Sequence, residues 1–121
     1  MDDATTLIEL KKELEKLRDE RDWKQFHTPK DVGEQIAVEA GELLELFLWK
    51  SGADVLKKME EDAEYRNDVE EEFADVLLSC FTFANAADID IATVVKKKLE
   101  KVKNKYPVEK SKGNATKYNR L

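Results

Sequence analysis

The sequence predicts a single all-α domain, and three observations support this fold class. Charged residues make up 40% of the 121 positions, whereas glycine occurs four times and proline twice. The abundant residues Glu, Lys, Leu and Ala are strong helix formers. Apolar residues recur at three- and four-residue spacing along most of the chain, which is the period of an amphipathic helix.

The apolar period and the helix-breaking residues predict where each helix begins and ends. We expect helices over residues 4–21, 32–50, 53–61, 62–87 and 91–105. Asp31 can cap the second helix, and Asp88 or Asp90 can cap the last. Residues 1–107 then form a bundle of four to five helices, and residues 108–121 form an irregular tail. Because the second helix is apolar around most of its circumference, we expect a homodimer or homotetramer to complete the core.

The charge and the cysteine content exclude several classes of function. A net charge of −6 and an isoelectric point near 5.0 leave no basic stripe for nucleic acid. No stretch of 18 apolar residues is long enough to span a membrane. Cys80 is the only cysteine, so no intrachain disulfide can form, and the polar start lacks the apolar segment of a secretory signal. We therefore expect a cytoplasmic protein without a membrane or nucleic-acid partner.

Two pairs of acidic residues occupy unusual positions on the predicted helices. Glu39 and Glu42 interrupt an apolar arc of the second helix, whereas Glu45 lies on its polar side. Glu72 and Asp75 lie beside the predicted core stripe of the long helix, which consists of Val69, Phe73, Val76 and Cys80. Each pair is spaced i,i+3, so its side chains project from one face of the helix. Two such helices packed antiparallel bring four carboxylates together.

Four carboxylates in a partly buried pocket require a cation to offset desolvation and like-charge repulsion. Oxygen ligands favour Mg²⁺, Mn²⁺ or Ca²⁺, and we expect Mg²⁺, for which Mn²⁺ can substitute. A di-iron bundle needs Glu-x-x-His pairs, and the only histidine, His27, lies outside both helices. On spacing alone, a solvated acidic face explains the two pairs equally well.

With these residues in place, the chain resembles the all-α nucleoside triphosphate pyrophosphatases of the MazG type, most closely the dCTP-pyrophosphatase-like branch. The resemblance rests on residues 21–30, 38–49, 71–77, 105–108 and 113–118. It implies that catalysis and metal binding depend on Glu39, Glu42, Glu72 and Asp75. It further implies Mg²⁺-dependent cleavage of a nucleoside triphosphate to monophosphate and pyrophosphate, as in house-cleaning of the nucleotide pool.

The resemblance also suggests residues that bind the substrate. A base would lie among Trp23, His27 and Trp49, for which packing roles are the alternative. Lys98 and Tyr106 are further candidates for substrate binding, although a lysine on a helix surface is often only solvated. Ser79 and Val102 stand where the dCTP-specific members carry Tyr and Asn, so the preferred base and sugar stay open.

Two other functions compete with this interpretation. A phosphoribosyl-ATP pyrophosphatase has similar acids, but the aromatic connector at residues 23–29 argues against it. A non-catalytic helical interaction module would leave the acids solvated and pair its apolar arcs with partner helices.

Overall fold

The computed structural model describes all residues from Met1 to Leu121 and is entirely helical, as the sequence predicts. The chain divides into two compact units, Met1–Asp88 and Ile89–Leu121. The first unit contains α1 (Leu7–Glu20), a 3₁₀ turn (Lys24–Phe26), α2 (Pro29–Glu45), α3 (Gly52–Glu61) and α4 (Ala63–Ala87). The second contains α5 (Ile91–Lys105), α6 (Val108–Ser111) and a 3₁₀ turn (Tyr118–Arg120).

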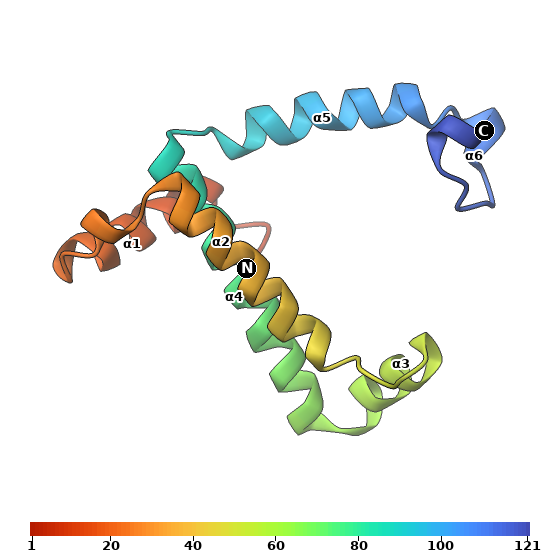
Figure 1. Ribbon diagram of the computed structural model, residues 1–121, viewed down its shortest axis with the longest axis horizontal. Coiled ribbons are helices and arrows are strands. Elements are labelled where there is room, and N and C mark those ends of the chain that lie inside the picture. Colours follow the sequence, from red (N-terminus) through yellow and green to blue (C-terminus); the bar gives the residue numbers. More distant parts are fainter. The chain divides into compact units, whose positions relative to one another are not determined.

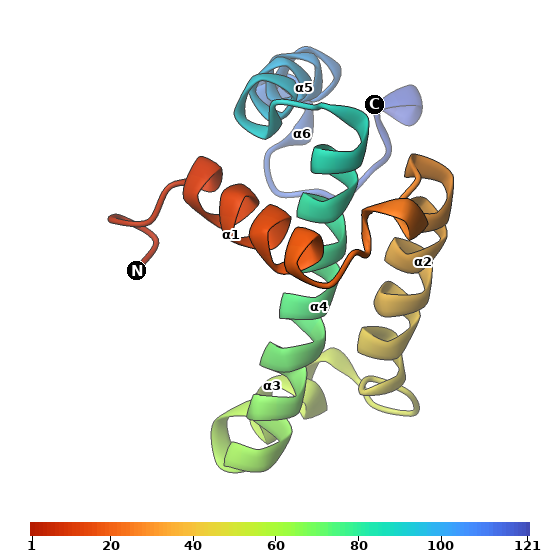
Figure 2. The same cartoon turned by 90° about the vertical axis from the view of Figure 1, so that its left-hand side faces the viewer.

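The first unit is organised around α4, its longest helix. Figures 1 and 2 show α2 running antiparallel beside α4, with α1 crossing α4 and α3 lying at its beginning. Tyr65, Val69 and Ser79 of α4 are buried, and Glu72 and Val76 between them are half-buried. These five positions alternate spacings of four and three, so they form one row along the buried side of α4.

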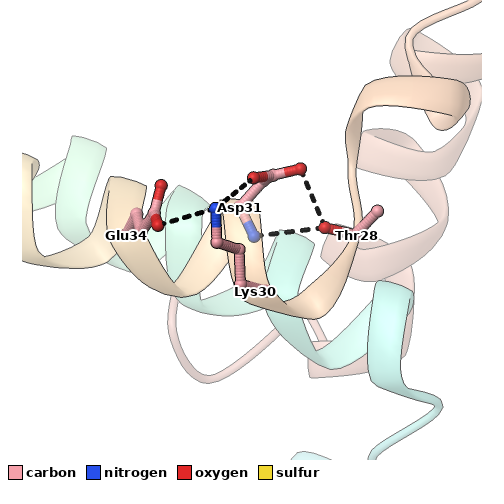
Figure 3. Close-up of polar contacts among 4 residues, drawn as sticks. All are labelled: Thr28, Lys30, Asp31 and Glu34. Carbon is pink, nitrogen blue, oxygen red and sulfur yellow. Dashed lines mark hydrogen bonds and ion pairs between the residues drawn. The ribbon is translucent and has the colours of Figure 1, made fainter.

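The beginning of α2 differs from the prediction. Thr28, not Asp31, is the N-cap: its hydroxyl oxygen accepts the Asp31 N–H at 3.2 Å. Pro29 follows at the first helical position, where its missing N–H costs no hydrogen bond. Asp31 instead accepts hydrogen bonds from the Thr28 hydroxyl at 2.9 Å and from the Lys30 ammonium at 3.3 Å (Figure 3). Lys30 also pairs with Glu34 at 2.9 Å, so one ionic network fixes this end of the helix.

The end of α2 also differs, because a tertiary contact terminates the helix before the sequence signal does. The helix ends at Glu45 rather than near residue 50. The Tyr65 hydroxyl of α4 donates a hydrogen bond of 2.7 Å to the Leu46 carbonyl, one of the carbonyl groups that a helix end leaves unpaired. Trp49 then adopts a left-handed conformation with φ of 63°, which is unusual for a bulky residue.

The other helices are close to their predicted ranges. Asp90 caps α5, and Asp88 is instead the left-handed residue that ends α4. The tail is not wholly irregular, because α6 and the last 3₁₀ turn lie within it. It folds back within the second unit, where the ring of Tyr118 packs edge-on against Tyr106 at 6.1 Å and lies under the Lys105 ammonium at 4.6 Å.

The core of the first unit is small. Its buried apolar residues are Val32, Tyr65, Val69 and Ala84, and the buried polar ones are Arg18 and Ser79. Phe73, predicted to lie in the core, is 54% exposed, because α4 turns Glu72 rather than Phe73 toward its buried side. Large apolar residues are also exposed on the other helices, so completion of the core by a second copy stays a prediction. No helix is by itself long and apolar enough to cross a membrane; only α4 and α5 taken together have the length and composition of a span.

Candidate functional site

The antiparallel packing of α2 and α4 brings together acids that are far apart in the sequence. Glu39 on α2 and Glu72 and Asp75 on α4 each offer a carboxylate oxygen, and these three oxygens lie within 4.8 Å of one another. All three residues are half-buried. Glu42 is exposed and outside this closest group, although its charge acts on two of the three. The two sequence pairs therefore meet, with three acids converging and the fourth beside them.

Burial and mutual repulsion disfavour the charged forms of these acids. Burial raises the pKa of Glu39 above its ordinary value, and the neighbouring charges of Glu42, Asp75 and Glu72 raise this pKa further. Burial likewise raises the pKa of Glu72, with added contributions from Glu42, Asp75 and Glu45. Glu45 is the acid that the helical wheel places on the polar side of α2. It is exposed, but it lies near enough to act on Glu72 across the two helices.

The arrangement of the oxygens fits a divalent cation. The Oε2 atoms of Glu39 and Glu72 are buried and have no hydrogen-bond partner, which is costly for a carboxylate. A hard cation satisfies such oxygens and relieves the repulsion between the acids. Carboxylate oxygens without histidine or thiolate ligands favour Mg²⁺ or Mn²⁺ over the softer transition metals.

A pocket of about 180 Å³ opens directly beside the acids. Trp23 and His27 of the connector line it, and so do Glu39 and Asp75 of the acidic group. The remaining lining residues are Leu14, Leu17, Gln35, Leu78, Ser79 and Thr82. Glu39 and Asp75 thus border both the cation site and an aromatic pocket.

Gln35 and Thr82 line this pocket but were not among the residues predicted to bind substrate, whereas Ser79 was noted only through the family resemblance. Gln35 lies one helical turn before Glu39, and Ser79 and Thr82 lie one and two turns after Asp75. Their helical spacing of four and seven residues from Glu39 and Asp75 places them beside the acids. The Thr82 hydroxyl donates to the Leu78 carbonyl at 2.8 Å, so its oxygen can still accept a hydrogen bond in the pocket.

The aromatic side of the pocket is held by its own contacts. The rings of Trp23 and His27 lie 6.4 Å apart, and the Arg21 guanidinium lies 5.7 Å from the Trp23 ring centre. Burial lowers the pKa of His27 below its ordinary value, and the buried Arg18 charge lowers this pKa further. His27 is therefore a neutral imidazole at neutral pH, and its buried Nδ1 has no hydrogen-bond partner.

The other three residues expected at the substrate do not line this pocket. Trp49 is 98% exposed beyond the far end of α2, a helix of 17 residues that separates it from His27. Lys98 belongs to the second unit, where it lines a shallow basic surface with Val94, Lys97 and Lys101. Tyr106 is half-buried in the same unit, against Tyr118.

Comparisons with known proteins agree with the all-α fold. Residues 35–121 match the model of the MazG-like family. The chain is 38% identical to dCTP pyrophosphatase 1 of Rattus norvegicus and 32% identical to that of Homo sapiens, each over 102 residues. Each match covers 84% of this chain but 59% of the relative, so the chain spans little more than half the length of these curated relatives. The protein belongs to the MazG-like family.

A solved structure extends the likeness to three dimensions. A pyrophosphatase from Archaeoglobus fulgidus superposes with a TM-score of 0.71 at 39% sequence identity. The match covers 78% of this chain and 85% of that one. The chain is thus homologous to dCTP pyrophosphatases and to a pyrophosphatase of known structure.

The raised pKa values predict how the stability of the metal-free protein depends on pH. Protonation of Glu39 and Glu72 stabilises the folded state more than the unfolded state, because their folded pKa values exceed the ordinary value of 4.5. This stabilisation is complete below pH 4.5 and is lost as the pH rises through the raised values. We expect the urea midpoint of the metal-free protein to fall over this range, and to fall less in Glu39→Gln. A midpoint in wild type that rises or stays level across the range contradicts the assignment.

Proposed function

We propose that the chain is a divalent-metal-dependent nucleoside triphosphate pyrophosphohydrolase, which cleaves a triphosphate to the monophosphate and pyrophosphate. One observation carries the proposal: Glu39 and Asp75 border both the cation site and the pocket of Trp23 and His27. A ligand that fills both places must join a flat ring to an anionic group that binds metal. A nucleotide has this chemistry, and the printed names of the relatives, dCTP pyrophosphatase 1 and pyrophosphatase, support it.

The residues of the chain divide the work between them. Glu39, Glu72 and Asp75 hold Mg²⁺, or Mn²⁺ in its place. When bound, the ion neutralises the phosphate charge and activates a water. Glu42 stands beside these ligands without belonging to the closest group, so its carboxylate is the group placed to accept the proton of the attacking water. Trp23 stacks on the base, and the neutral His27 offers it a hydrogen bond.

The position of Trp49 makes a second copy part of this proposal. A helix of 17 residues is about 25 Å long, so Trp49 and His27 lie on opposite ends of α2. Trp23, His27 and Trp49 can hold one base only if Trp49 comes from another copy of the chain. The expected homodimer or homotetramer is then required for a complete base pocket. Lys98 and Tyr106 of the second unit, residues 89–121, are proposed to bind the phosphates, with the tail beyond residue 107 beside them.

The composition of the site favours this function over a phosphoribosyl-ATP pyrophosphatase and over a non-catalytic interaction module. The pocket offers aromatic rings beside neutral polar side chains and has room for a base. The curated relatives from Rattus norvegicus and Mus musculus bear the name dCTP pyrophosphatase 1, which favours a nucleoside triphosphate over phosphoribosyl-ATP. A non-catalytic interaction module would not account for the half-buried Glu39 and Glu72, whose Oε2 atoms have no hydrogen-bond partner. The base and the sugar remain to be assigned by a panel of nucleoside triphosphates scored for pyrophosphate release.

Glu72 and Glu71 provide a matched test, because they are adjacent on α4 but only Glu72 faces the acidic group. Glu72→Gln keeps the shape and removes one charge, so pyrophosphate release should fall at least about 100-fold. The metal-free protein should melt at the same or a higher temperature, because repulsion is relieved. Glu71→Gln should change stability by no more than about 0.5 kcal/mol and leave activity intact. Equal activity of the two variants would overturn the site and favour an interaction module.

The shared base pocket predicts that two variants with a raised KM complement each other. Loss of one stacking ring costs about 1–3 kcal/mol, so Trp23→Ala and Trp49→Ala should each raise KM by roughly 5- to 150-fold. When the two variants are co-expressed, a mixed dimer contains one site with both tryptophans. About a quarter of all sites should then show the wild-type KM, as statistical pairing in a twofold dimer requires. If no such fraction is measured in verified mixed dimers, the two rings do not meet across copies.

A further inference from the structure

A second hollow of the first unit is apolar and separate in chemistry from the acidic site. It lies between α1 and α4, has a volume of about 400 Å³, and we call it the α1/α4 groove. Its walls are Leu10, Leu14 and Leu17 on α1 and Leu77, Leu78 and Phe81 on α4. Leu17 and Leu77 are each 40% exposed, so no other part of this unit covers the groove. A hollow of this kind favours an apolar helix face as its occupant.

The edge of the groove is acidic. Glu13 is the only charged residue that lines it, and Glu9 lies one turn earlier on the same side of α1. The unit as a whole carries twenty-four acidic and eleven basic residues, of the 27 and 21 in the chain. Two such grooves would repel each other if they met face to face. The occupant should therefore have an apolar stripe with basic flanks.

Helix α5 has this combination of properties. Val95, Leu99 and Val102 recur at i, i+4 and i+7, and they are 49%, 50% and 38% exposed. On a helical wheel, Lys98 and Lys105 flank this stripe on one side, and Lys96 and Lys103 flank it on the other. Ile89–Leu121 carries ten basic and three acidic residues. The net charge of −6 for the whole chain conceals this opposite charge of the two units.

We propose that α5 of a second copy of the chain lies in the α1/α4 groove. The charge complementarity disfavours pairing of groove with groove and of α5 with α5, because both would bring like charges together. In a twofold dimer each copy would give its α5 and receive that of its partner, so the contact closes and buries both stripes. Fifteen residues make α5 about 22 Å long, enough to contact the groove over several turns.

The occupant would also reach the catalytic pocket indirectly. Leu14, Leu17 and Leu78 line both the groove and the pocket of Trp23 and His27. A helix seated in the groove therefore packs against the far side of the pocket wall. This contact does not depend on the proposed reaction, because its evidence lies in the apolar faces and charges alone.

Crosslinking between two different chains tests the contact directly. In a Cys80→Ser background, one chain carries Glu13→Cys at the groove and a second, size-tagged chain carries Lys96→Cys beside the stripe. A short bismaleimide should join the two chains when they are assembled together, and the mixed product should be the main one. A doubly substituted chain that crosslinks only within itself would show that its own α5 fills the groove. Either that result or no crosslink at all would overturn the proposal.

A matched pair of charge insertions provides a second measurement. Leu99→Asp places a charge within the stripe, whereas Asn104→Asp places the same charge on the opposite side of α5. Light scattering at micromolar concentration should give half the wild-type mass for Leu99→Asp and the full mass for Asn104→Asp, with unchanged helicity for both. Equal masses for the two variants would show that the stripe is not an interface. These readouts involve no catalysis, so they can fail while the proposed reaction stands.

Discussion

The antiparallel packing of α2 on α4 determines most of what this protein can do, because the two helices pack through carboxylates as well as through apolar side chains. In the row that α4 turns inward, Glu72 stands between Val69 and Val76. Each buried carboxylate lowers the free energy of burial that the row would otherwise provide. A divalent cation bound between the helices, as proposed above, would offset this cost where the acids converge.

The same packing explains why the site needs so few residues. Glu39 and Asp75 lie where the acidic group and the aromatic pocket meet, so two side chains connect ion binding to ring binding. Their carboxylates are held by helix backbones rather than by loops, which fixes their positions. The connector that carries Trp23 and His27 is anchored to α1, since the Trp23 N–H donates to the Arg18 carbonyl at 2.9 Å. The first unit thus positions both the aromatic rings and the acids of the proposed cation site.

The limited core connects this site to assembly. Four apolar residues are buried in the first unit, whereas many larger ones remain exposed. Burial of apolar surface contributes about 25 cal/mol per Å². Exposed stripes such as that of α5 would therefore stabilise the protein if a second copy covered them. The opposite charges of the two units then favour contact between unlike units of different copies. The proposed assembly would offset this deficit and would also complete the proposed base pocket.

The sequence predicted helix positions better than helix orientation. The range of α5 was predicted exactly as residues 91–105, because Asp90 and Tyr106-Pro107 are strong local signals. A helical wheel gives only the relative directions of side chains on one helix. It therefore placed Phe73 inside and Glu72 beside it, whereas the contact with α2 reverses their exposure. The early end of α2 depends on the Tyr65 hydrogen bond, which no local pattern reveals.

The acid pairs were found because a charge on an apolar arc is conspicuous. Neutral pocket residues such as Gln35 and Thr82 are not conspicuous, since amides and hydroxyls occur on every kind of helix face. The exposure of Trp49 was likewise not predictable, because it depends on where the helix stops. Local chemistry thus identified the acids that the fold brings together, and tertiary contacts determined which residues share a pocket.

Anomalous diffraction from crystals grown with Mn²⁺ and a non-hydrolysable deoxynucleoside triphosphate tests the central claim most directly, because it locates the ion without reference to activity. An anomalous peak should lie among the carboxylates of Glu39, Glu72 and Asp75, with the base density beside Trp23 and His27. Manganese found only at the exposed acids of residues 60–64, or triphosphate bound away from these carboxylates, would contradict the account.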